Sequence, residues 1–344
     1  MPECTDIPES TRSLRLLSFV LLVILVVSTL FSIWFYRLVT TPVELPVIPC
    51  EFSIEPRGSL RNIAQQLTNA DILPNAWSFI LLAHMTGYNA SLKAGEYELT
   101  QNLSPLDLLE YLTQGRVKQH TITFLEGWTF SQFRKVLDEH PAIHHVSSEF
   151  SNLKLLELIG AKEPGVEGIF FPDTYFFTKN SSDLTILKRA YHAMQRHLET
   201  EWISRQKSLP LKNQYEGLIL ASIIEKETGR DNERAWIAGV FVNRLRHNMK
   251  LQTDPTVIYG MGDKFGGNLR KIDLQTDHAY NTYTRPGLPP TPIAMPGLAS
   301  IRAAFNPAIT DKLYFVAKGD GTSHFSSTLE EHNRAVLKYQ KNRP

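Results

Sequence analysis

The sequence predicts an α+β protein with a single N-terminal transmembrane helix, a small βααβ unit and then a larger mixed α/β domain. Three observations indicate this class. Residues 16–36 form one uncharged apolar run, strand and helix patterns follow each other from residue 50 onward, and the composition is globular. The chain has 344 residues, of which 42% are hydrophobic and 21% charged, enough for two or three compact units.

Composition excludes several classes of protein. The net charge of +1 gives no basic field that would favour nucleic acid as a partner. Cys4 and Cys50 lie on opposite sides of the apolar run, so we expect no disulfide between them. No Cys/His cluster has zinc spacing, and His144 with His145 is expected in a solvated loop. We therefore expect neither a metal nor another cofactor.

The apolar run at 16–36 is expected to anchor the chain in a membrane. At about 1.5 Å per residue it is long enough to cross a bilayer core of roughly 30 Å. Arg12 and Arg15 precede it, while Trp34 and Tyr36 lie at its far end, so residues 1–15 should be cytoplasmic and the remainder outside. The run is too long for a cleavable signal core and no A-x-A site follows, which indicates a retained anchor.

A connector and a small unit follow the anchor. Three prolines in residues 37–49 favour an extended linker. In residues 50–117 we expect strands at 51–54 and 96–99, with helices capped by Ser59 and by Ser104, and another helix at 77–85. The strand, helix, helix, strand order is similar to a LysM module, a fold that binds glycans. A packing or spacer domain is the alternative.

Residues 118–344 are expected to form the main domain. A strand at 121–125 is followed by a helical insertion at 130–160 with helices at 130–139 and 153–159. The aromatic run at 165–178 suits a buried strand or a glycan cleft, and we expect its phenylalanines in the core. Its acids, Glu167 and Asp173, are candidates for substrate contact.

Two glutamates end the helix predicted at 217–227. At about 100° per residue, Glu225 shares a stripe with Ala221 and Ser222, whereas Glu227 lies about 200° away among larger apolar side chains. They cannot face each other as the acid and base pair of most glycoside hydrolases. The small residues beside Glu225 leave room for a ligand, which favours Glu225 as the reactive group. Alternatively, both are helix-end charges, with Glu227 paired to Arg230.

Separated motifs then establish a resemblance. They are ASIIEKET (221–228), FVNRL (241–245), LQTDPTVIYGMG (251–262), YNTY (280–283) and GLPPTPIAMPG (287–297). In this order they resemble the YceG-like, or MltG, family of endolytic murein transglycosylases. EGIFFPDTYFF (167–177), the anchor and the LysM-like unit match as well, so the likeness covers nearly everything after residue 15.

The resemblance implies an enzyme of the bacterial inner membrane whose catalytic domain faces the periplasm. Such enzymes cut peptidoglycan strands internally, between N-acetylmuramic acid and N-acetylglucosamine, and leave 1,6-anhydromuramic ends. The first acid of the family's E-K-E motif, Glu225 here, is implied to be the catalytic residue. It would protonate the glycosidic oxygen and then take the proton of the muramyl C6 hydroxyl, so one carboxylate suffices.

Polar residues of the later motifs are the candidates for holding the sugars. Amide, hydroxyl and phenol groups can grip acetamido and hydroxyl groups. The candidates are Gln252, Thr253, Asp254, Tyr280, Asn281 and Tyr283. Asp254 precedes a proline and could instead be a turn residue.

Two other functions compete with this one. The first is a lysozyme-like muramidase that uses an activated water. The second is a membrane-tethered, non-catalytic glycan-binding scaffold of the cell-wall machinery. Peptidoglycan synthases are the protein partners expected in either case, beside the glycan strands and the lipid bilayer.

Overall fold

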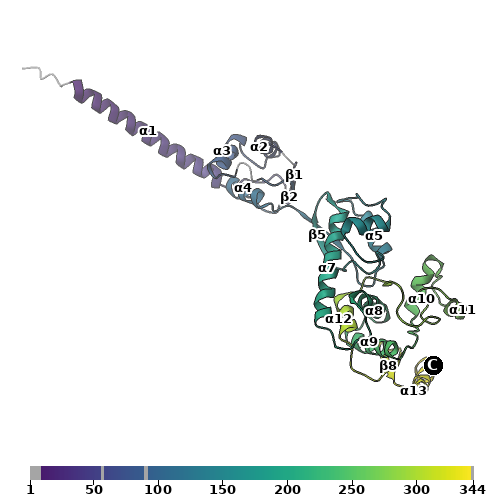
Figure 1. Cartoon of the computed structure of the whole chain (residues 1–344). Helices are drawn as coiled ribbons and strands as arrows, with labels where there is room; N and C mark the ends of the chain where they lie inside the picture. Colours follow the sequence, from purple (N-terminus) through teal and green to yellow (C-terminus); the bar gives the residue numbers. More distant parts are fainter. Residues whose placement is uncertain (1–8, 56–57, 89–91, 342–344) are drawn as a thin grey trace, which may run out of the picture. The chain divides into compact units, whose positions relative to one another are not determined.

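The computed structural model describes residues 9–55, 58–88 and 92–341, which form two compact units (Figure 1). The first unit comprises residues 1–119 and the second comprises residues 120–344. Cys4 and most of the expected cytoplasmic tail lie outside the described residues. The predicted mixed α/β class and the single N-terminal apolar helix are confirmed.

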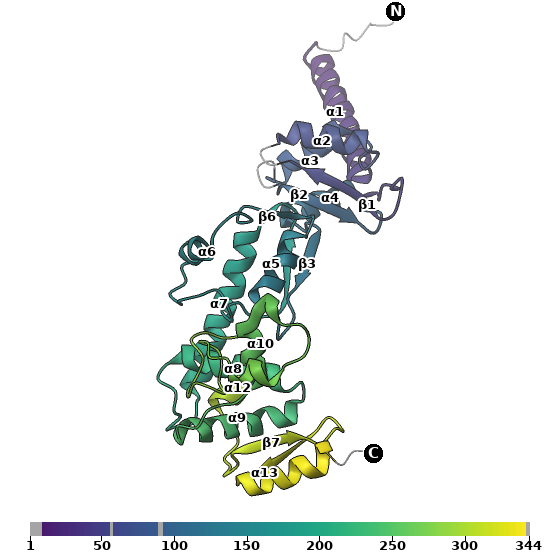
Figure 2. The ribbon, with the colours of Figure 1, turned by 90° about the vertical axis from the view of Figure 1, so that its right-hand side faces the viewer.

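The first unit pairs two strands and packs helices beside them (Figure 2). Its strands are antiparallel, with Phe52 opposite Tyr97. The element order predicted for this unit is present, and its likeness to a LysM module stays a prediction. The elements are α1 (Glu9–Thr40), β1 (Cys50–Ile54), α2 (Leu60–Asn69), α3 (Ala76–Met85), β2 (Gly95–Leu99) and α4 (Pro105–Gln114).

Local sequence explains where the helices of this unit begin and end. The Ser59 hydroxyl accepts from the Asn62 N–H at the start of α2, and the Ser104 hydroxyl accepts from the Asp107 N–H at the start of α4. Gly115 ends α4 in the left-handed conformation, with φ of 68°. Both serine caps were predicted, and the structure confirms them.

The predicted linker at 37–49 is partly helical. Its first residues are the last turn of α1, because no helix breaker occurs before Pro42. Phe35 and Val39 of α1 are buried in the core of the first unit. The Val43 N–H then donates to the Leu103 carbonyl at 3.0 Å. The end of α1 is therefore packed against the unit that follows it.

The described part of the second unit consists mainly of helices, with three small two-stranded sheets, and Tyr175 and Phe177 of β5 reach its core. β3 pairs with β5, β4 is parallel to β6, and β7 is antiparallel to β8. The elements are β3 (Gln119–Thr123), α5 (Phe130–Asp138), β4 (Ile143–His144), α6 (Asn152–Ile159), β5 (Thr174–Thr178), β6 (Ser181–Ser182), α7 (Asp183–Ile203), α8 (Gln214–Glu227), α9 (Asp231–Arg246), α10 (Asp254–Met261), η1 (Gly262–Lys264), α11 (Lys271–Gln275), α12 (Leu298–Phe305), β7 (Tyr314–Ala317), β8 (Ser323–Ser326), α13 (Leu329–Val336) and η2 (Leu337–Lys341).

The core of this unit lies around α8, which packs against α7, α9 and α12 (Figure 1). The expected helical insertion at 130–160 contributes to the same core: Phe133 and Leu137 of α5 and Leu155 of α6 are buried in it. The phenylalanines of the aromatic run are also largely core residues. Phe170 and Phe171 are buried, while Phe176 of β5 is 54% exposed.

Two helices begin directly after loop segments of the later motifs. The polar loop after α9 ends at Thr253, because Asp254 and Pro255 begin α10 with proline in the favoured first turn. The segment 287–297 is a loop, and α12 begins directly after Gly297. The helix α9 starts at Asp231, where two acids in its first turn suit the helix dipole.

Candidate active site

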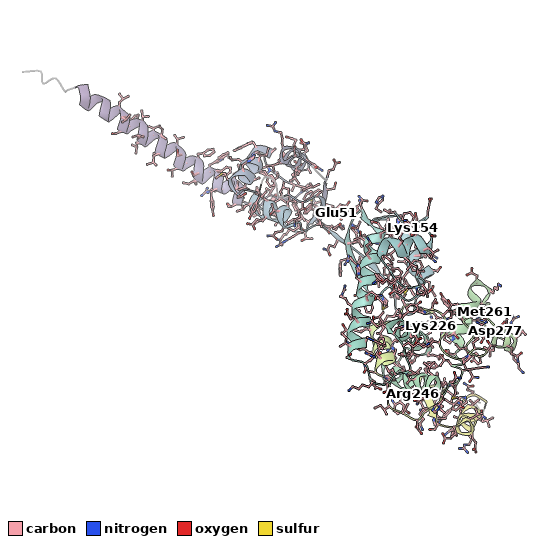
Figure 3. The ribbon with its side chains drawn as sticks, viewed as in Figure 1. Glu51, Lys154, Lys226, Arg246, Met261 and Asp277 are labelled. Carbon is pink, nitrogen blue, oxygen red and sulfur yellow. The ribbon has the colours of Figure 1, made fainter. Side chains whose placement is uncertain are left out.

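The helix α8 positions both glutamates of the E-K-E motif. The Asn213 side chain caps it by accepting from the Glu216 N–H at 2.9 Å, and residues 217–224 are all buried. A Cβ on Gly217 would lie 2.2 Å from the Phe305 ring, so glycine lets α12 approach closely. The glutamates occupy the last turn, on either side of Lys226, which is labelled in Figure 3.

Glu227 lines a cavity of about 590 Å³, which we call the Glu227 cavity. Sequence-predicted contact residues from two motifs, Gln252, Asp254 and Tyr283, line it as well. The other walls come from α9, the strand β7 and the C-terminal helices. The remaining lining residues are Arg244, Leu251, Tyr314, Phe315, Val316, Ala317, Leu329, His332, Asn333, Val336 and Gln340.

The surroundings of the Glu227 carboxyl raise its pKa. Burial raises its pKa above the ordinary value; the hydrogen bond from the Thr253 hydroxyl acts in the opposite direction, and the Asp254 carboxylate raises it again. As the last residue of α8, Glu227 also faces the negative end of the helix dipole, which disfavours a second negative charge. The expected partner Arg230 instead donates to the Asp320 carbonyl at 3.1 Å.

Buried hydroxyls fix the loop that carries Gln252 and Thr253. The Gln252 N–H donates to the Thr282 carbonyl at 3.1 Å, and the Thr253 N–H donates to the Thr282 hydroxyl at 3.1 Å. Thr256 of α10 shares a further hydrogen bond with the Thr282 hydroxyl at 2.9 Å. Gln252 is held at φ of 52°, an uncommon conformation for a side chain of this type. The loop is therefore rigid, and the exposed amide of Gln252 faces the cavity.

Tyr283 and Asp254 form a polar pair in the same cavity. The Tyr283 hydroxyl donates to the Asp254 carboxylate at 2.5 Å, and burial first and that hydrogen bond second raise the tyrosine pKa. Across the cavity, the Tyr314 ring stacks on His332 with ring centroids 5.2 Å apart. The cavity thus combines carboxyl, amide and phenol groups with an aromatic wall, which is the chemistry that sugars require.

Arg244 holds the backbone around the cavity rather than serving only the helix dipole. Its guanidinium donates to the carbonyls of Leu313 at 2.6 Å, Leu251 at 2.7 Å and Lys250 at 3.3 Å. Burial lowers the pKa of this buried arginine. It therefore ties the start of β7 and the Gln252 loop to α9.

Glu225 lies on the other side of α8, between the start of α12 and an arginine of α9. One of its oxygens accepts from the Gly297 N–H at 3.0 Å, at the N-terminus of α12. The other lies 4.0 Å from the Arg234 guanidinium, and both side chains are only 8% exposed. Arg234 in turn donates to Ser300 at 3.1 Å. These contacts join α8, α9 and α12.

The small residues beside Glu225 are covered by protein. Ala221 and Ser222 are fully buried, and the Ser222 hydroxyl accepts from the Ile293 N–H at 3.0 Å. The segment around Ile293 therefore occupies the side of the helix where a ligand was expected. Glu225 itself stays the residue predicted from the sequence, while the predicted sugar-contacting loop faces Glu227.

A third carboxyl, Glu126, lies beside Glu225. A Cβ on Gly297 would lie 1.8 Å from a Glu126 carboxyl oxygen, so this carboxyl lies directly over Gly297. Burial first and the Glu225 carboxylate second raise the pKa of Glu126. Sequence reasoning missed Glu126 and Arg234. For Glu126, the only signal in the sequence was its place in an E-G-W sequence directly after a predicted strand. For Arg234, a single arginine near the start of a helix, the sequence gave no signal.

Glu167 lines a second cavity, of about 660 Å³, which we call the Glu167 cavity. One carboxyl oxygen accepts from the Phe130 N–H at 3.0 Å and the other from the Tyr259 hydroxyl at 3.1 Å. Burial raises the Glu167 pKa to about 7, against the effect of these hydrogen bonds. Tyr280 lines the same cavity and is hydrogen-bonded to Thr291 at 2.8 Å.

The helix α10 links the two cavities. Asp254 at its start lines the Glu227 cavity, and Tyr259, about 8 Å further along the axis at 1.5 Å per residue, lines the Glu167 cavity. Met261, labelled in Figure 3, ends the helix. The two predicted tyrosines of the YNTY motif are divided in the same way, with Tyr283 in the first cavity and Tyr280 in the second.

Two residues that were predicted to contact sugars, Asn281 and Asp173, line neither of these cavities. Asn281 is fully buried, and its amide nitrogen, which has two hydrogens to donate, lies within hydrogen-bond distance of three carbonyls: Asp273 at 3.3 Å, Leu274 at 3.1 Å and Thr276 at 2.7 Å. It holds the end of α11. Asp173 is exposed and accepts from the N–H of the next residue, Thr174, at 2.7 Å.

Three side chains could hold a metal ion away from these cavities. Ligand atoms of Asp138, His145 and Asp183 lie within 4.8 Å of one another. However, Asp183 already accepts from the N–H and the hydroxyl of Ser147, at 2.9 and 2.8 Å. Asp138 accepts from Arg134 at 3.0 Å. We assign the cluster to organising the loop around Ser147.

Comparison with known proteins places the chain. The YceG-like family matches residues 52–338. An endolytic murein transglycosylase of Bacillus subtilis (strain 168) is 34% identical over 304 residues, covering 82% of each chain. One of Streptococcus pneumoniae serotype 2 is 30% identical over 320 residues; the match covers 83% of this chain and 57% of that relative. A crystal structure of a YceG-like protein from Listeria monocytogenes aligns with a TM-score of 0.51 at 28% identity, covering 83% of this chain and 98% of that one.

Proposed function

Because the chain belongs to the YceG-like family, we propose that it is a lytic transglycosylase that cleaves peptidoglycan glycan strands internally. The names of its relatives supply the activity. The observation in this chain that carries the proposal is the Glu227 cavity. It brings one carboxyl with a raised pKa together with sugar-binding groups from two separate motifs.

We assign the acid and base role to Glu227 in preference to Glu225. A general acid must hold a proton until the glycosidic bond breaks, and the surroundings of Glu227 favour the protonated form. Glu225 instead has its carboxyl oxygens in contact with the Gly297 N–H and near the Arg234 guanidinium, so it joins α8 to α12 and α9. Glu225 remains the assignment made from the sequence, and matched variants of the two residues separate them.

The reaction needs one carboxyl because the substrate supplies the nucleophile. Protonated Glu227 donates to the oxygen between N-acetylmuramic acid and N-acetylglucosamine as the C1–O bond breaks. The resulting carboxylate then takes the proton of the muramyl C6 hydroxyl while that oxygen bonds to C1. The product is a 1,6-anhydro end, no water is consumed, and Glu227 is protonated again.

The residues around Glu227 orient the substrate and the carboxyl. Thr253 fixes one carboxyl oxygen through its hydroxyl, and Thr282 fixes Thr253. Gln252 and the Asp254–Tyr283 pair are placed to contact acetamido and hydroxyl groups of the sugars. The Glu167 cavity, joined to the first by α10, suits a neighbouring sugar of a long strand, as internal cleavage requires.

We further propose that α1 anchors the chain in the bacterial inner membrane. Residues Leu16–Thr40 are long and apolar enough to cross a bilayer, with mean hydropathy of 2.8. Arg12 and Arg15 favour a cytoplasmic N-terminus, so both units would face the periplasm. Peptidoglycan synthases are the protein partners that this location favours.

The mass of the products tests the proposed activity. The full chain in detergent is incubated with purified peptidoglycan, and the fragments are analysed by mass spectrometry. Internal fragments that end in anhydromuramic acid support the proposal. Fragments heavier by one water indicate a muramidase, and intact strands with folded protein indicate a glycan-binding scaffold; either result contradicts it.

A further inference from the structure

The helix α3 is apolar on both of its faces. Phe79, Leu82 and Ala83 point into the core of the first unit and are buried. The opposite stripe, which we call the outer face of α3, consists of Trp77, Ile80, Leu81, His84 and Met85 at helical spacing. Ile80 and Leu81 are half-buried against the core, and the other three residues are exposed. Trp77 is 47% exposed and Met85 is 68% exposed. A helix that is apolar all round is typical of a buried or membrane-associated helix rather than one facing water.

The depth of this face follows from α1. At 1.5 Å per residue, a bilayer core of roughly 30 Å takes about 20 residues, so a span that starts at Leu16 ends near Phe35. Trp34 therefore lies at the outer boundary of the apolar core. The Trp77 ring stacks on the Trp34 ring, with centroids 5.9 Å apart and planes 16° apart. Trp77 is thus at the same depth as Trp34.

The first unit cannot move away from this boundary by a flexible connection. Phe35 and Val39 are the next inward-facing residues of α1, and both are buried in the core of the unit. The chain beyond them is also attached, since the Leu45 N–H donates to the Asn102 side chain at 3.1 Å. The membrane span and the first unit are therefore one packed body, with α3 beside the end of α1 (Figure 1).

We infer that the outer face of α3 lies in the interfacial region of the same bilayer that α1 crosses. The inference rests on the proposed membrane anchor and adds a second contact with lipid. Tryptophan prefers this region because its ring is apolar while its N–H needs a polar partner. Trp34 and Trp77 would form one aromatic belt, with Leu81 and Met85 extending the apolar contact. The first unit would then contact the membrane through both α1 and α3.

Fluorescent labels at single cysteines test this placement in the full chain. Cys4 and Cys50 are replaced by serine, and an environment-sensitive fluorophore is attached at Met85→Cys. The protein is reconstituted in vesicles of phosphatidylethanolamine and phosphatidylglycerol that contain lipids spin-labelled either near the headgroup end or near the middle of the acyl chain. Leu25→Cys, within the span, reports the anchor. Ser53→Cys is the matched exposed control on β1, which Figures 1 and 2 place away from the free end of α1.

The expected result is strong loss of fluorescence at position 25 with the mid-chain label, strong loss at position 85 with the label near the headgroup, and little loss at position 53 with either. Quenching at 25 without quenching at 85 overturns the inference and leaves the proposed anchor unaffected. The outer face of α3 would then be expected to bind a protein partner. Absence of quenching at both positions overturns the anchor and the inference together. Introducing Leu81→Glu into the chain labelled at 85 should reduce its quenching to the level of position 53. Unchanged quenching in this variant also contradicts a lipid contact through the outer face.

Discussion

The buried Glu167 carboxyl makes the stability of the second unit depend on pH. Its side chain is 8% exposed and its pKa is raised from 4.5 to about 7, chiefly by burial. At 1.36 kcal/mol per pKa unit, this shift corresponds to about 3 kcal/mol of stability. The folded state binds the proton more tightly than the unfolded chain does. The stabilisation is therefore complete below about pH 4.5 and is lost as pH rises through about 7.

Glu167→Gln removes this dependence. The glutamine oxygen can still accept from the Phe130 N–H, and the Tyr259 hydroxyl can turn to accept from the new amide. Between pH 4.5 and 8, the free energy of unfolding of the variant should fall by about 3 kcal/mol less than that of the wild type. Other titrating groups cancel in this difference because both chains contain them.

Denaturant unfolding of the full chain in detergent, followed at several pH values, measures the difference. Glu199→Gln is the matched control, since Glu199 is an exposed carboxylate on α7. The control should follow the wild-type curve. A Glu167→Gln chain whose stability falls as steeply with pH as wild type would refute the assignment of a proton to Glu167.

The remaining predictions concern the catalytic cavity and the packing behind it. Thr253→Val removes a hydrogen bond that lowers the Glu227 pKa, so the alkaline limb of the cleavage rate should move to higher pH; an unchanged profile contradicts the role of this contact. Gly217→Ala places a Cβ 2.2 Å from the Phe305 ring and should cost about 1–3 kcal/mol in the free energy of unfolding, and an unaffected melting temperature would show that the helices can separate. Asn281→Ala removes the donor that faces three buried carbonyls and should lower the free energy of unfolding by about 1–3 kcal/mol, measured by denaturant unfolding. A loss confined to glycan affinity would instead support the direct sugar contact predicted from its motif.

Local sequence signals determined much of the fold. Serine caps, glycine stops and helical periodicity located α2, α4 and α8 because each of these depends on neighbours in the chain. The starts of α10 and α12 were missed. Both follow segments rich in proline and glycine, which indicate turns as readily as the first turn of a helix.

The surroundings of the candidate site residues could be predicted only in part from local sequence patterns. Helix geometry indicated that Glu225 and Glu227 point to different sides, and their contacts lie on separate sides of α8. Ala221 and Ser222 indicated room beside Glu225, but small residues also allow another segment to pack closely, and Ile293 occupies that side. Which segment covers a helix face depends on contacts between residues far apart in sequence. The pattern of one helix does not contain that information.

The rates of two isosteric variants test the central assignment most directly. Glu227→Gln and Glu225→Gln change the same chemical group two positions apart on one helix, and cleavage of purified peptidoglycan is measured for both, with folding and glycan binding as controls. Loss of a positioned acid and base lowers the rate on the order of 10² to 10⁴. We predict this loss in Glu227→Gln, with strands still bound, and a much smaller loss in Glu225→Gln that follows its stability. A folded Glu227→Gln chain that cleaves at the wild-type rate, beside an inactive Glu225→Gln chain, would contradict the account.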